Sequence, residues 1–271
     1  MNLLFSIDSR CVSLLLDCLS SIADRGGAKH YDAYVLHSGL TEEEMSHIAA
    51  EAPDSAACYF VPVPPDLFAG FPTTKRYPLQ IYYRLAAPLL LPESLDRVLY
   101  LDVDTVVINS LVPLYESGLE GNLFMACTHT QELLSKANRV RLGIEKDVPY
   151  INTGVMMMNL ALLRKALDIS AIQAYALAYE PVLILPDQDI LTALYGDRVK
   201  LLDTMIYNLS DGTLAQHNAN PKNPKRDLQW VRDNSVVIHY FGRNKPWKEP
   251  YLGVLDVFYC EARARQSGKR L

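Results

Sequence analysis

Two aspartates interrupt an apolar stretch near the middle of the chain, and they are its clearest candidates for chemistry. Asp102 and Asp104 stand within residues 98–108, where every other residue is aliphatic, aromatic or threonine. Residues two apart in an extended strand point to the same side, so both carboxylates are expected to converge. Carboxylates in such surroundings are costly unless a cation or a proton compensates them. The pattern predicts a cation site, with acids that merely cap a strand-end turn as the alternative.

A second candidate motif covers residues 239–247, directly after the apolar residues 236–238. His239 offers an imidazole ligand, Gly242 allows close approach of the backbone, and Lys245 adds a cation. These are the parts of a metal–diphosphate site. The other histidines are expected in the core or in solvent; they are His30, His37, His47, His129 and His217.

Two carboxylates and one imidazole indicate which metal to expect. The set suits an octahedral divalent ion, and its nitrogen ligand favours Mn²⁺ over Mg²⁺ or Ca²⁺, with Mg²⁺ as a possible substitute. Zinc is less expected, because no cysteine or second histidine lies nearby in the sequence.

Acids at two other positions have both a functional and a structural interpretation. Asp8 follows the first apolar segment, and ligands of open α/β sheets collect beyond the carboxyl ends of strands. A role as the first acid of a helix explains Asp8 equally well. Asp187 and Asp189 flank Gln188 at a predicted helix start, where acids serve as caps. This structural role is strongest for Asp189.

The order of apolar segments predicts an α/β fold, because strand-like and helix-like segments alternate over the first hundred residues, as in βαβ units with a mainly parallel sheet. Strands are predicted at residues 3–7, 31–36, 58–61, 98–108, 123–127, 151–160 and 236–240. Helices are predicted from residue 12 to the glycines at 26–27, after a capping box at Thr41, and at residues 79–87, 132–141, 162–179, 187–195 and 254–266. Residues 208–225 are expected to form a long surface loop.

Composition excludes several classes of protein. With 271 residues and 49% apolar residues the chain can bury a large α/β core. A net charge of −5 argues against nucleic acid as a partner. Five scattered cysteines read as reduced thiols. The start lacks a signal-like leader, and no apolar segment approaches the roughly 18 residues of a spanning helix, so we expect a cytoplasmic protein.

Further motifs complete an ordered set that covers most of the chain. They are residues 5–8, Tyr83-Arg84-Leu85, residues 99–104, residues 151–155 with Asn159-Leu160, residues 187–189 and residues 239–247. In this order they resemble glycosyltransferase family 8, the retaining nucleotide-sugar transferases that include glycogenin and bacterial lipopolysaccharide galactosyl- and glucosyltransferases. The resemblance runs from about residue 3 to residue 247.

The resemblance implies a GT-A fold, a Rossmann-like nucleotide-diphospho-sugar transferase architecture, in one domain over residues 1–271. Residues 1–107 would form the nucleotide-binding half, residues 108–249 the acceptor and sugar half, and residues 250–271 a C-terminal helix. The implied metal ligands are Asp102, Asp104 and His239. The implied nucleotide and phosphate contacts are Asp8, Ser6, Ile7, Val103, Gly154, Gly242 and Lys245. The transferred sugar would contact Arg84, Asn152 and Asp187, with Gln188 beside the anomeric carbon.

The implied reaction is the Mn²⁺-dependent transfer of galactose or glucose from a UDP-sugar to a saccharide or glycolipid acceptor, with retention of configuration. An amide such as Gln188 is a poor nucleophile. We therefore favour attack from the leaving-group face through an oxocarbenium-like state, with diphosphate oxygen accepting the proton. A covalent intermediate on Asp187 or Asp189 is the minority hypothesis.

Two features depart from the family pattern. Arg10-Cys11 stands where relatives usually have an aromatic residue that stacks on uracil, which bears on the identity of the base. The chain also ends soon after its last helix. The basic residues Arg263, Arg265, Lys269 and Arg270 could make a weak peripheral contact with an anionic membrane, although the helix dipole explains them more simply.

Two other functions compete with the glycosyltransferase. A phosphatase of the haloacid-dehalogenase type would use Asp102 as nucleophile and Asp104 as acid/base, but it would leave residues 239–247 unexplained. A non-catalytic nucleotide-sugar-binding protein would keep the fold and lose a metal ligand, Lys245 or the Asp187-Gln188 pair, and the sequence retains all of these.

Overall fold

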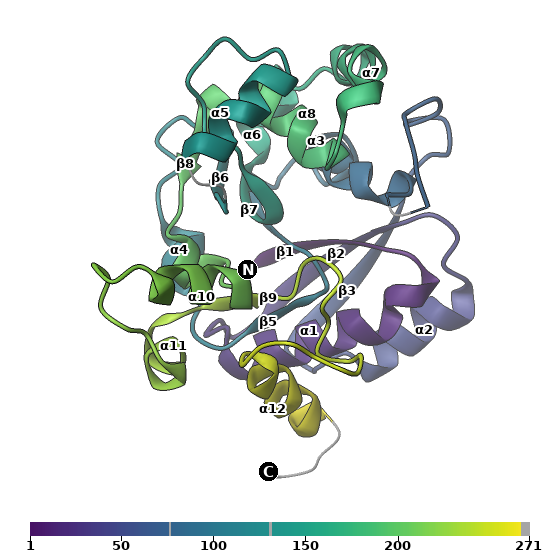
Figure 1. Ribbon diagram of the computed structural model, residues 1–271. Helices are drawn as coiled ribbons and strands as arrows, with labels where there is room; N and C mark the ends of the chain where they lie inside the picture. Colours follow the sequence, from purple (N-terminus) through teal and green to yellow (C-terminus); the bar gives the residue numbers. More distant parts are fainter. Residues whose placement is uncertain (76, 130–131, 267–271) are drawn as a thin grey trace.

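The computed structural model describes residues 1–75, 77–129 and 132–266 (Figure 1). Its strands are β1 (Asn2–Ile7), β2 (Tyr31–His37), β3 (Ala56–Pro62), β4 (Arg97–Leu101), β5 (Thr105–Val107), β6 (Phe124–Cys127), β7 (Asn152–Asn159), β8 (Val199–Leu201) and β9 (Val237–His239). Its α-helices are α1 (Val12–Arg25), α2 (Glu42–Glu51), α3 (Ala87–Leu90), α4 (Val112–Glu116), α5 (Glu132–Arg141), α6 (Leu160–Ala166), α7 (Ile169–Ala178), α8 (Pro186–Tyr195), α9 (Thr204–Tyr207), α10 (Asp211–Ala219), α11 (Leu228–Asn234) and α12 (Asp256–Gln266). Short 3₁₀ helices are η1 (Ser9–Cys11), η2 (Leu79–Ala86), η3 (Glu180–Val182) and η4 (Gly196–Arg198).

A seven-stranded sheet in the order β3-β2-β1-β4-β7-β6-β8 forms the centre of the molecule. β1 pairs in parallel with β2 and β4, and β2 with β3. β7 runs antiparallel to both of its neighbours, β4 and β6, while β8 is parallel to β6. Within this seven-stranded sheet, every strand except β7 therefore runs in the same direction. The predicted α/β fold with a mainly parallel sheet is confirmed.

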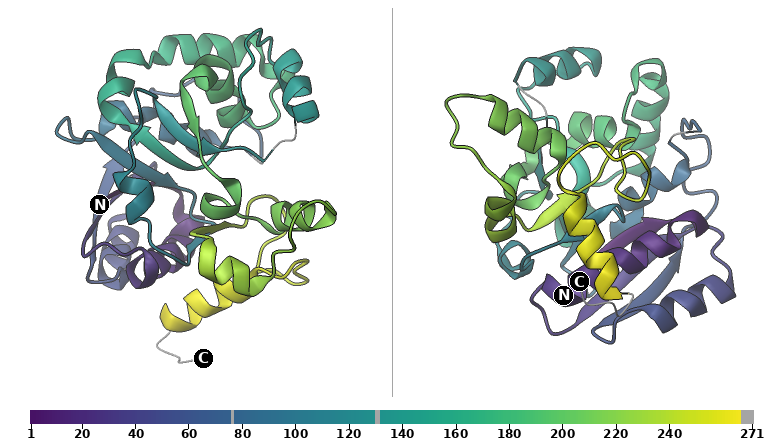
Figure 2. Two further views of the ribbon diagram at one scale, coloured as in Figure 1. Left: turned by 90° about the vertical axis from the view of Figure 1, so that its left-hand side faces the viewer. Right: turned by 60° about the horizontal axis from the view of Figure 1, so that its bottom comes forward.

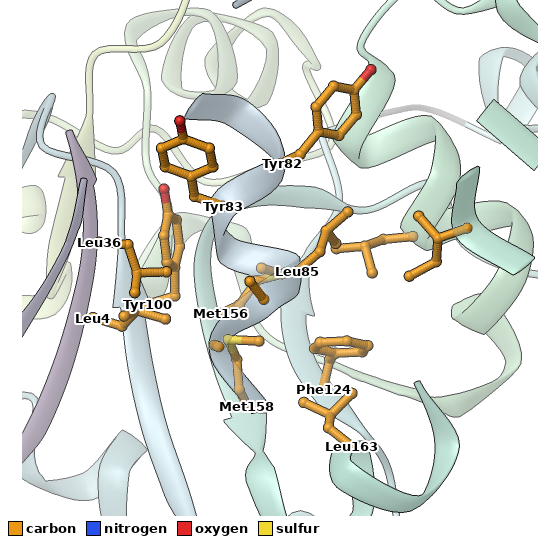
Figure 3. Packing of buried hydrophobic residues seen from close by; sticks show 14 of the residues in the cluster. Leu4, Leu36, Tyr82, Tyr83, Leu85, Tyr100, Phe124, Met156, Met158 and Leu163 are labelled. Carbon is orange, nitrogen blue, oxygen red and sulfur yellow. The ribbon is translucent and has the colours of Figure 1, made fainter. Parts of the chain in front are cut away.

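Alternate side chains of the sheet pack against two different layers of helices. Leu4 of β1 belongs to a cluster with η2, α3, α6, α7 and α8, whereas Leu3 and Phe5 belong to a cluster with α1 and α2. Figure 3 shows part of the first cluster, where Tyr100 and Met156 of the sheet meet η2. The sheet is thus buried on both faces, as mainly parallel sheets require.

A two-stranded sheet, β5 with β9, and the helices around it form a third cluster. The antiparallel register sets Thr105 opposite His239. The C-terminal helix α12 packs against α1 at the far end of this cluster (Figure 2). The Tyr259 hydroxyl donates to Asp17 Oδ2 of α1 at 2.8 Å. The small sheet therefore joins residues 237–239 to the segment that directly follows β4 and the aspartate pair.

The prediction of one strand across the two aspartates is wrong. β4 ends at Leu101 and β5 begins at Thr105, so the aspartates lie in the turn between them. The Thr105 hydroxyl closes this turn by donating to the Asp102 carbonyl at 2.8 Å. The chain leaves the large sheet here because β4 pairs with β7 and β5 pairs with β9. The carboxylates converge through the turn and not through strand alternation.

Two other helix predictions differ in detail from the structure. Residues 79–87 form the 3₁₀ helix η2, which is continued by α3. Residues 162–179 are divided between α6 and α7, because Asp168 caps a new helix by accepting from the amides of Ser170 and Ala171. The capping box predicted at Thr41 is confirmed at the start of α2.

The predicted surface loop at residues 208–225 is wrong in its first half. The helix α10 begins after Ser210, whose hydroxyl accepts from the Thr213 amide at 3.2 Å. The short elements α4, α9, α11 and β8 were not predicted either. Segments of three to seven residues show no readable periodicity, since a helical pattern needs about three turns to emerge.

Among the described helices, none has both the length and the apolar character that crossing a bilayer requires. Arg265 of α12 donates to Asp24 at 2.8 Å. Lys269 and Arg270 lie outside the described residues. The contact of basic C-terminal residues with an anionic surface stays a prediction.

Asp189 anchors the first turn of α8, as its structural interpretation predicted. Its fully buried carboxylate accepts from Arg141 at 2.7 and 2.9 Å and from the Tyr150 hydroxyl at 2.7 Å. It also accepts from the amides of Ile184 and Leu185, at 2.7 and 3.1 Å. This single carboxylate therefore fixes where α8 starts and how its preceding residues approach the sheet.

We expect Asp189→Asn to lower the free energy of unfolding by about 3 kcal/mol, because the neutral amide leaves the partly buried Arg141 without a counter-charge. The amide NH₂ group would also face N–H groups, which can only donate to it. Urea unfolding at pH 7, followed by circular dichroism, measures the change.

Asp147→Asn is the matched control. Asp147 pairs with Arg139, which belongs to the same helix α5 as Arg141, but the Asp147 side chain is 90% exposed. The expected cost of this substitution is below about 0.5 kcal/mol. Equal losses for the two variants would contradict the anchoring role of Asp189.

Candidate functional site

A cavity of about 840 Å³ opens where β1 and β4 end and where the antiparallel β7 begins. These ends coincide because β7 runs opposite to its neighbours. The predicted site residues that line the cavity are Ser6, Arg84, Asp102, Val103, Asp104, Asn152, Gly154, Asp187, Gln188, His239, Gly242 and Lys245. The topology therefore brings residues from distant parts of the sequence to one place.

Asp102, Asp104 and His239 form a cluster suited to a metal ion. Each offers one ligand atom, and these atoms lie within 4.8 Å of one another. His239 Nε2 lies 3.1 Å from Asp104 Oδ1 and 3.7 Å from Asp102 Oδ2. The aspartate side chains are 28% and 19% exposed, so an ion can reach them from the cavity. Two carboxylate oxygens and an imidazole nitrogen fit a divalent ion such as Mn²⁺ or Mg²⁺.

Arg84 compensates the charge on the sheet side of the cluster. Its guanidinium donates to Asp102 Oδ1 at 3.0 Å and to the Thr153 carbonyl at 2.8 Å, and it lies 3.4 Å from Asp187 Oδ2. Burial opposes the charge, but Asp102 and then Tyr100 and Asp187 raise the pKa of Arg84. The guanidinium therefore stays charged and links the aspartate turn to the start of α8.

Asp187 is buried and receives a hydrogen bond from the Thr153 hydroxyl at 2.7 Å. Burial raises its pKa above the ordinary value, although Arg84 and Thr153 act in the opposite direction. The adjacent Gln188 lines the cavity, whereas Asp189 faces Arg141 and Tyr150. The first turn of α8 therefore presents one carboxylate and one amide to the cavity.

Lys245 and His239 compensate Asp104. The ammonium group of Lys245 contacts Asp104 Oδ2 and donates to the Tyr240 carbonyl at 2.6 Å. Burial alone would raise the pKa of Asp104, but His239 and Lys245 outweigh it and hold the pKa well below the ordinary range. The loop that carries Lys245 turns at Gly242, whose φ of 86° favours glycine.

Gly154 lets β7 approach the cluster closely. A Cβ atom there would stand 2.1 Å from His239 Cε1 and 2.7 Å from Asp102 Oδ2. No side chain fits at these distances, so the glycine is a requirement of the site and not of the strand.

Two residues at the site were not predicted from the sequence. Asn208 lies in the stretch interpreted as a loop, is completely buried, and contacts both His239 and Asn152. His129 lines the cavity beside Phe241, with ring centroids 4.7 Å apart. Burial and the nearby His239 lower the pKa of His129 to about 4, so its ring is neutral at pH 7. Neither residue belongs to a recognisable motif, and only the fold brings them to the site.

Asp8 and Ile7 are the predicted residues that do not line the cavity. Asp8 caps η1 and accepts from the Arg10 guanidinium at 2.6 Å, which lowers its pKa. Cys11 does line the cavity, and burial, followed by Asp8, raises the pKa of its thiol to about 11. This part of the wall therefore presents a neutral thiol.

Comparison with protein families identifies a family for this chain. The model of "Glycosyl transferase family 8" matches residues 2–250. This range contains the aspartate turn, the start of α8 and the Lys245 loop. The phosphatase alternative for Asp102 and Asp104 finds no support, because the matched family consists of glycosyltransferases.

Several curated proteins are similar to this chain. A Haemophilus influenzae protein whose name assigns it only to the glycosyltransferases is 27% identical over 251 residues, 91% of this chain and 73% of its own length. A lipopolysaccharide 1,2-glucosyltransferase of Escherichia coli is 25% identical over 243 residues, 85% of this chain and 68% of its own. The lipopolysaccharide glucosyltransferase WaaO of E. coli K12 is 28% identical over 190 residues, but this chain spans only 53% of it.

The solved structures give a similarity that extends over the whole chain. Galactosyltransferase LgtC, in complex with donor and acceptor sugar analogs, superposes with a TM-score of 0.82 at 25% identity, covering 100% of this chain and 97% of LgtC. An active-site mutant of LgtC gives the same TM-score at 26% identity, covering 98% and 96%. Together with the family match, these comparisons establish that the chain belongs to glycosyl transferase family 8 and is a glycosyltransferase with the GT-A fold.

Proposed function

We propose that this glycosyltransferase moves galactose or glucose from a UDP-sugar to a saccharide or glycolipid acceptor, with retention of configuration and with Mn²⁺ as its metal. One observation carries the proposal: Asp102, Asp104 and His239 converge beside Lys245 at a cavity of about 840 Å³. Mg²⁺ would be a weaker substitute, because the imidazole ligand favours Mn²⁺.

The metal would be held by Asp102, Asp104 and His239 against the donor diphosphate. When bound, such an ion supplies Lewis-acid stabilisation of the negative charge on the leaving group. The ammonium of Lys245 now contacts Asp104, and because the Lys245 side chain is 16% exposed and lines the cavity, it would turn toward a phosphate oxygen bound there. It would then add a second positive charge where the leaving oxygens need it.

The donor sugar would lie against Arg84, Asn152 and Asp187. Arg84 and Asp187 are held by each other and by Thr153, so their positions are fixed before substrate binds. Such preorganisation aligns the anomeric carbon beside Gln188 without a reorganisation cost. We assign the nucleotide contacts to Ser6, Val103, Gly154 and Gly242, with Ile7 and Asp8 further along the same strand end.

The buried contacts of the carboxylates favour front-face attack. Asp187 lies against Arg84 and the Thr153 hydroxyl, and Asp189 is saturated with hydrogen bonds away from the cavity. Neither is placed as an unhindered nucleophile, and Gln188 is an amide. The acceptor hydroxyl would then attack from the leaving-group side and pass its proton to a diphosphate oxygen.

The acceptor is proposed from the relatives. Four of the similar proteins carry names as lipopolysaccharide glucosyl- or galactosyltransferases, which supports a lipopolysaccharide or related glycolipid acceptor for this chain and a cytoplasmic location. Tyr77 lines the cavity and would offer its ring to an acceptor sugar, whereas Tyr82 and Tyr83 are buried packing residues. We further propose that residues 1–107 and 108–249 act as donor and acceptor halves of one domain, to which the segment that carries α12 is added.

Proton NMR of the protein with Mn²⁺ and a panel of UDP-sugars tests the function. We expect slow hydrolysis of UDP-galactose or UDP-glucose, release of the α-sugar first, and loss of turnover with chelator. Hydrolysis of neither donor, by folded protein with bound Mn²⁺, would overturn the choice of uridine and direct attention to Cys11.

In the same assay Asp104→Ala should reduce turnover by about 100-fold or more, since a metal ligand matters at least as much as its outer-shell partners. Asp66→Asn, at an exposed position that does not line the cavity, is the control and should leave turnover unchanged. Donor binding without turnover in the unmodified protein would instead support the non-catalytic nucleotide-sugar-binding alternative.

Gly154→Ala should weaken Mn²⁺ binding by at least about 10-fold, because the new Cβ displaces the His239 ring and the Asp102 carboxylate. Titration with Mn²⁺, followed by electron paramagnetic resonance of the free ion, measures it. Gly118→Ala is the matched control, since a Cβ at Gly118 meets nothing within 4 Å. Unchanged affinity in Gly154→Ala would contradict the assigned ligand set.

Incubation with a 2-deoxy-2-fluoro UDP-sugar and intact-mass spectrometry tests the mechanism. Front-face attack predicts that no glycosyl adduct accumulates. An adduct mapped to Asp187 or Asp189 by peptide analysis would establish the covalent alternative.

A further inference from the structure

Asn208 bridges two residues of the site from behind the cavity wall. Its side chain is completely buried, and its Oδ1 lies 2.8 Å from His239 Nδ1. Its Nδ2 donates to Asn152 Oδ1 at 2.8 Å. The amide of Gly154 donates to the same Asn152 oxygen at 3.0 Å. These contacts form one chain of hydrogen bonds from β7 to the imidazole.

The direction of this chain is set by one group that cannot reverse. A backbone N–H only donates, so the Asn152 atom facing Gly154 must be the carbonyl oxygen. The Asn208 atom facing that oxygen must then be the amide nitrogen, because two oxygens would repel. Asn208 consequently turns its own oxygen toward His239.

An oxygen acceptor at 2.8 Å requires a proton on His239 Nδ1. In a neutral ring the proton is then absent from Nε2, and the Nε2 lone pair faces Asp104 Oδ1 at 3.1 Å and Asp102 Oδ2 at 3.7 Å. A lone pair opposite two carboxylates is favourable only with a cation or a second ring proton between them. The orientation needed for metal binding is therefore present in the protein alone.

Backbone hydrogen bonds hold this geometry in place. Asn208 ends α9, and the next residue, Leu209, donates to the Val237 carbonyl of β9 at 3.0 Å. His239 in turn donates from its backbone to the Leu209 carbonyl at 2.7 Å. The side chains of Asn208 and His239 are thus clamped side by side, with little freedom to choose other partners.

We infer that Asn208 is a positioning residue that fixes His239 in the Nδ1–H tautomer and couples it to Asn152. The inference rests on the proposed function, because it assumes that His239 Nε2 is a metal ligand. Outer-shell partners of this kind orient a ligand and fix its tautomer. Because Asn152 is assigned to the donor sugar, the same amide would join the metal side and the sugar side of the site.

Nitrogen-15 NMR of the histidine rings, on metal-free protein across a pH series, tests the tautomer directly. His239→Gln identifies the His239 signals by their absence. For the neutral ring we expect a pyrrole-type resonance at Nδ1 and a pyridine-type resonance at Nε2. The opposite assignment would overturn the inference, whatever the variants do.

Two substitutions separate the links of the chain. Asn208→Leu removes the hydrogen bonds to His239 and Asn152, and we expect mixed tautomers and about 10- to 100-fold weaker Mn²⁺ binding. Asn208→Asp keeps an oxygen opposite Nδ1 but places a second oxygen against Asn152. It should retain the tautomer and Mn²⁺ affinity, while the KM for the donor rises because Asn152 is displaced.

Asn109→Leu is the matched control, because Asn109 is also an asparagine that donates twice to carbonyls, at 2.9 and 2.6 Å, but lies outside the cavity. It should leave the tautomer and Mn²⁺ affinity unchanged. If Asn208→Leu does not fold, the tautomer in the unmodified protein and the behaviour of Asn208→Asp still test whether Asn208 positions His239.

The outcomes distinguish the inference from the proposed function. Suppose that the unmodified protein has an Nδ1–H ring and turns over no UDP-sugar, and that Asn208→Leu loses Mn²⁺ binding. The positioning role would then stand, and the proposed function would be wrong. Normal turnover, with an unchanged tautomer and unchanged Mn²⁺ affinity in Asn208→Leu, would sustain the function and remove the positioning role.

Discussion

The site depends on the compensation of three acidic side chains in a region largely withdrawn from water. Asp102, Asp104 and Asp187 face Arg84 and Lys245, so the carboxylates outnumber the strong cations by three to two. Burial raises the pKa of Asp187, whereas a second ring proton on His239, together with Lys245, lowers the pKa of Asp104 when no metal is bound. This imbalance favours a further cation, and it is the physical reason for expecting a metal here.

The acids and the cations that compensate them come from elements that lie far apart in the sequence. Arg84 belongs to η2, Lys245 to the loop after β9, and Asp187 to the start of α8. The sheet order decides their proximity: β7 enters antiparallel between β4 and β6, so its first residues lie where β4 ends. The small β5–β9 sheet then brings His239 opposite Thr105. A change in either pairing would separate the cations from the acids.

The sequence predicted the large elements well, because their apolar patterns are long. The strand β1 and the helices α1, α2 and α8 fall close to their predicted bounds. A turn at Asp102 was only the alternative interpretation, since aliphatic residues on both sides resemble one strand and only tertiary pairing divides it. α10 was missed because polar caps such as Ser210 look the same in a loop and at a helix start.

Within the site, the residues found from the sequence are those with a charged or glycine-specific role in a compact motif. Asp102, Asp104, His239 and Lys245 line one cavity, as their types and positions suggested. Asn208 and His129 could not be found in this way, because an asparagine or a lone histidine has several ordinary roles. Asp8 differs from these residues. Its position at a strand end suggested that it lines the cavity, but its carboxylate pairs with Arg10 and does not line the cavity.

Asp187 and Asp189 show how one helix start can serve both stability and the site. The two carboxylates are two residues apart, so they leave a helix about 200° apart and meet different surroundings. Asp189 accepts five hydrogen bonds and is fully buried, which fixes the helix start against α5. Asp187 can then remain in the cavity wall, where its carboxylate contacts the Thr153 hydroxyl and the Arg84 guanidinium. The anchor at Asp189 on one side of α8 thus allows the other side to carry a carboxylate whose charge is incompletely compensated. Such a carboxylate can still accept a hydrogen bond from a hydroxyl group.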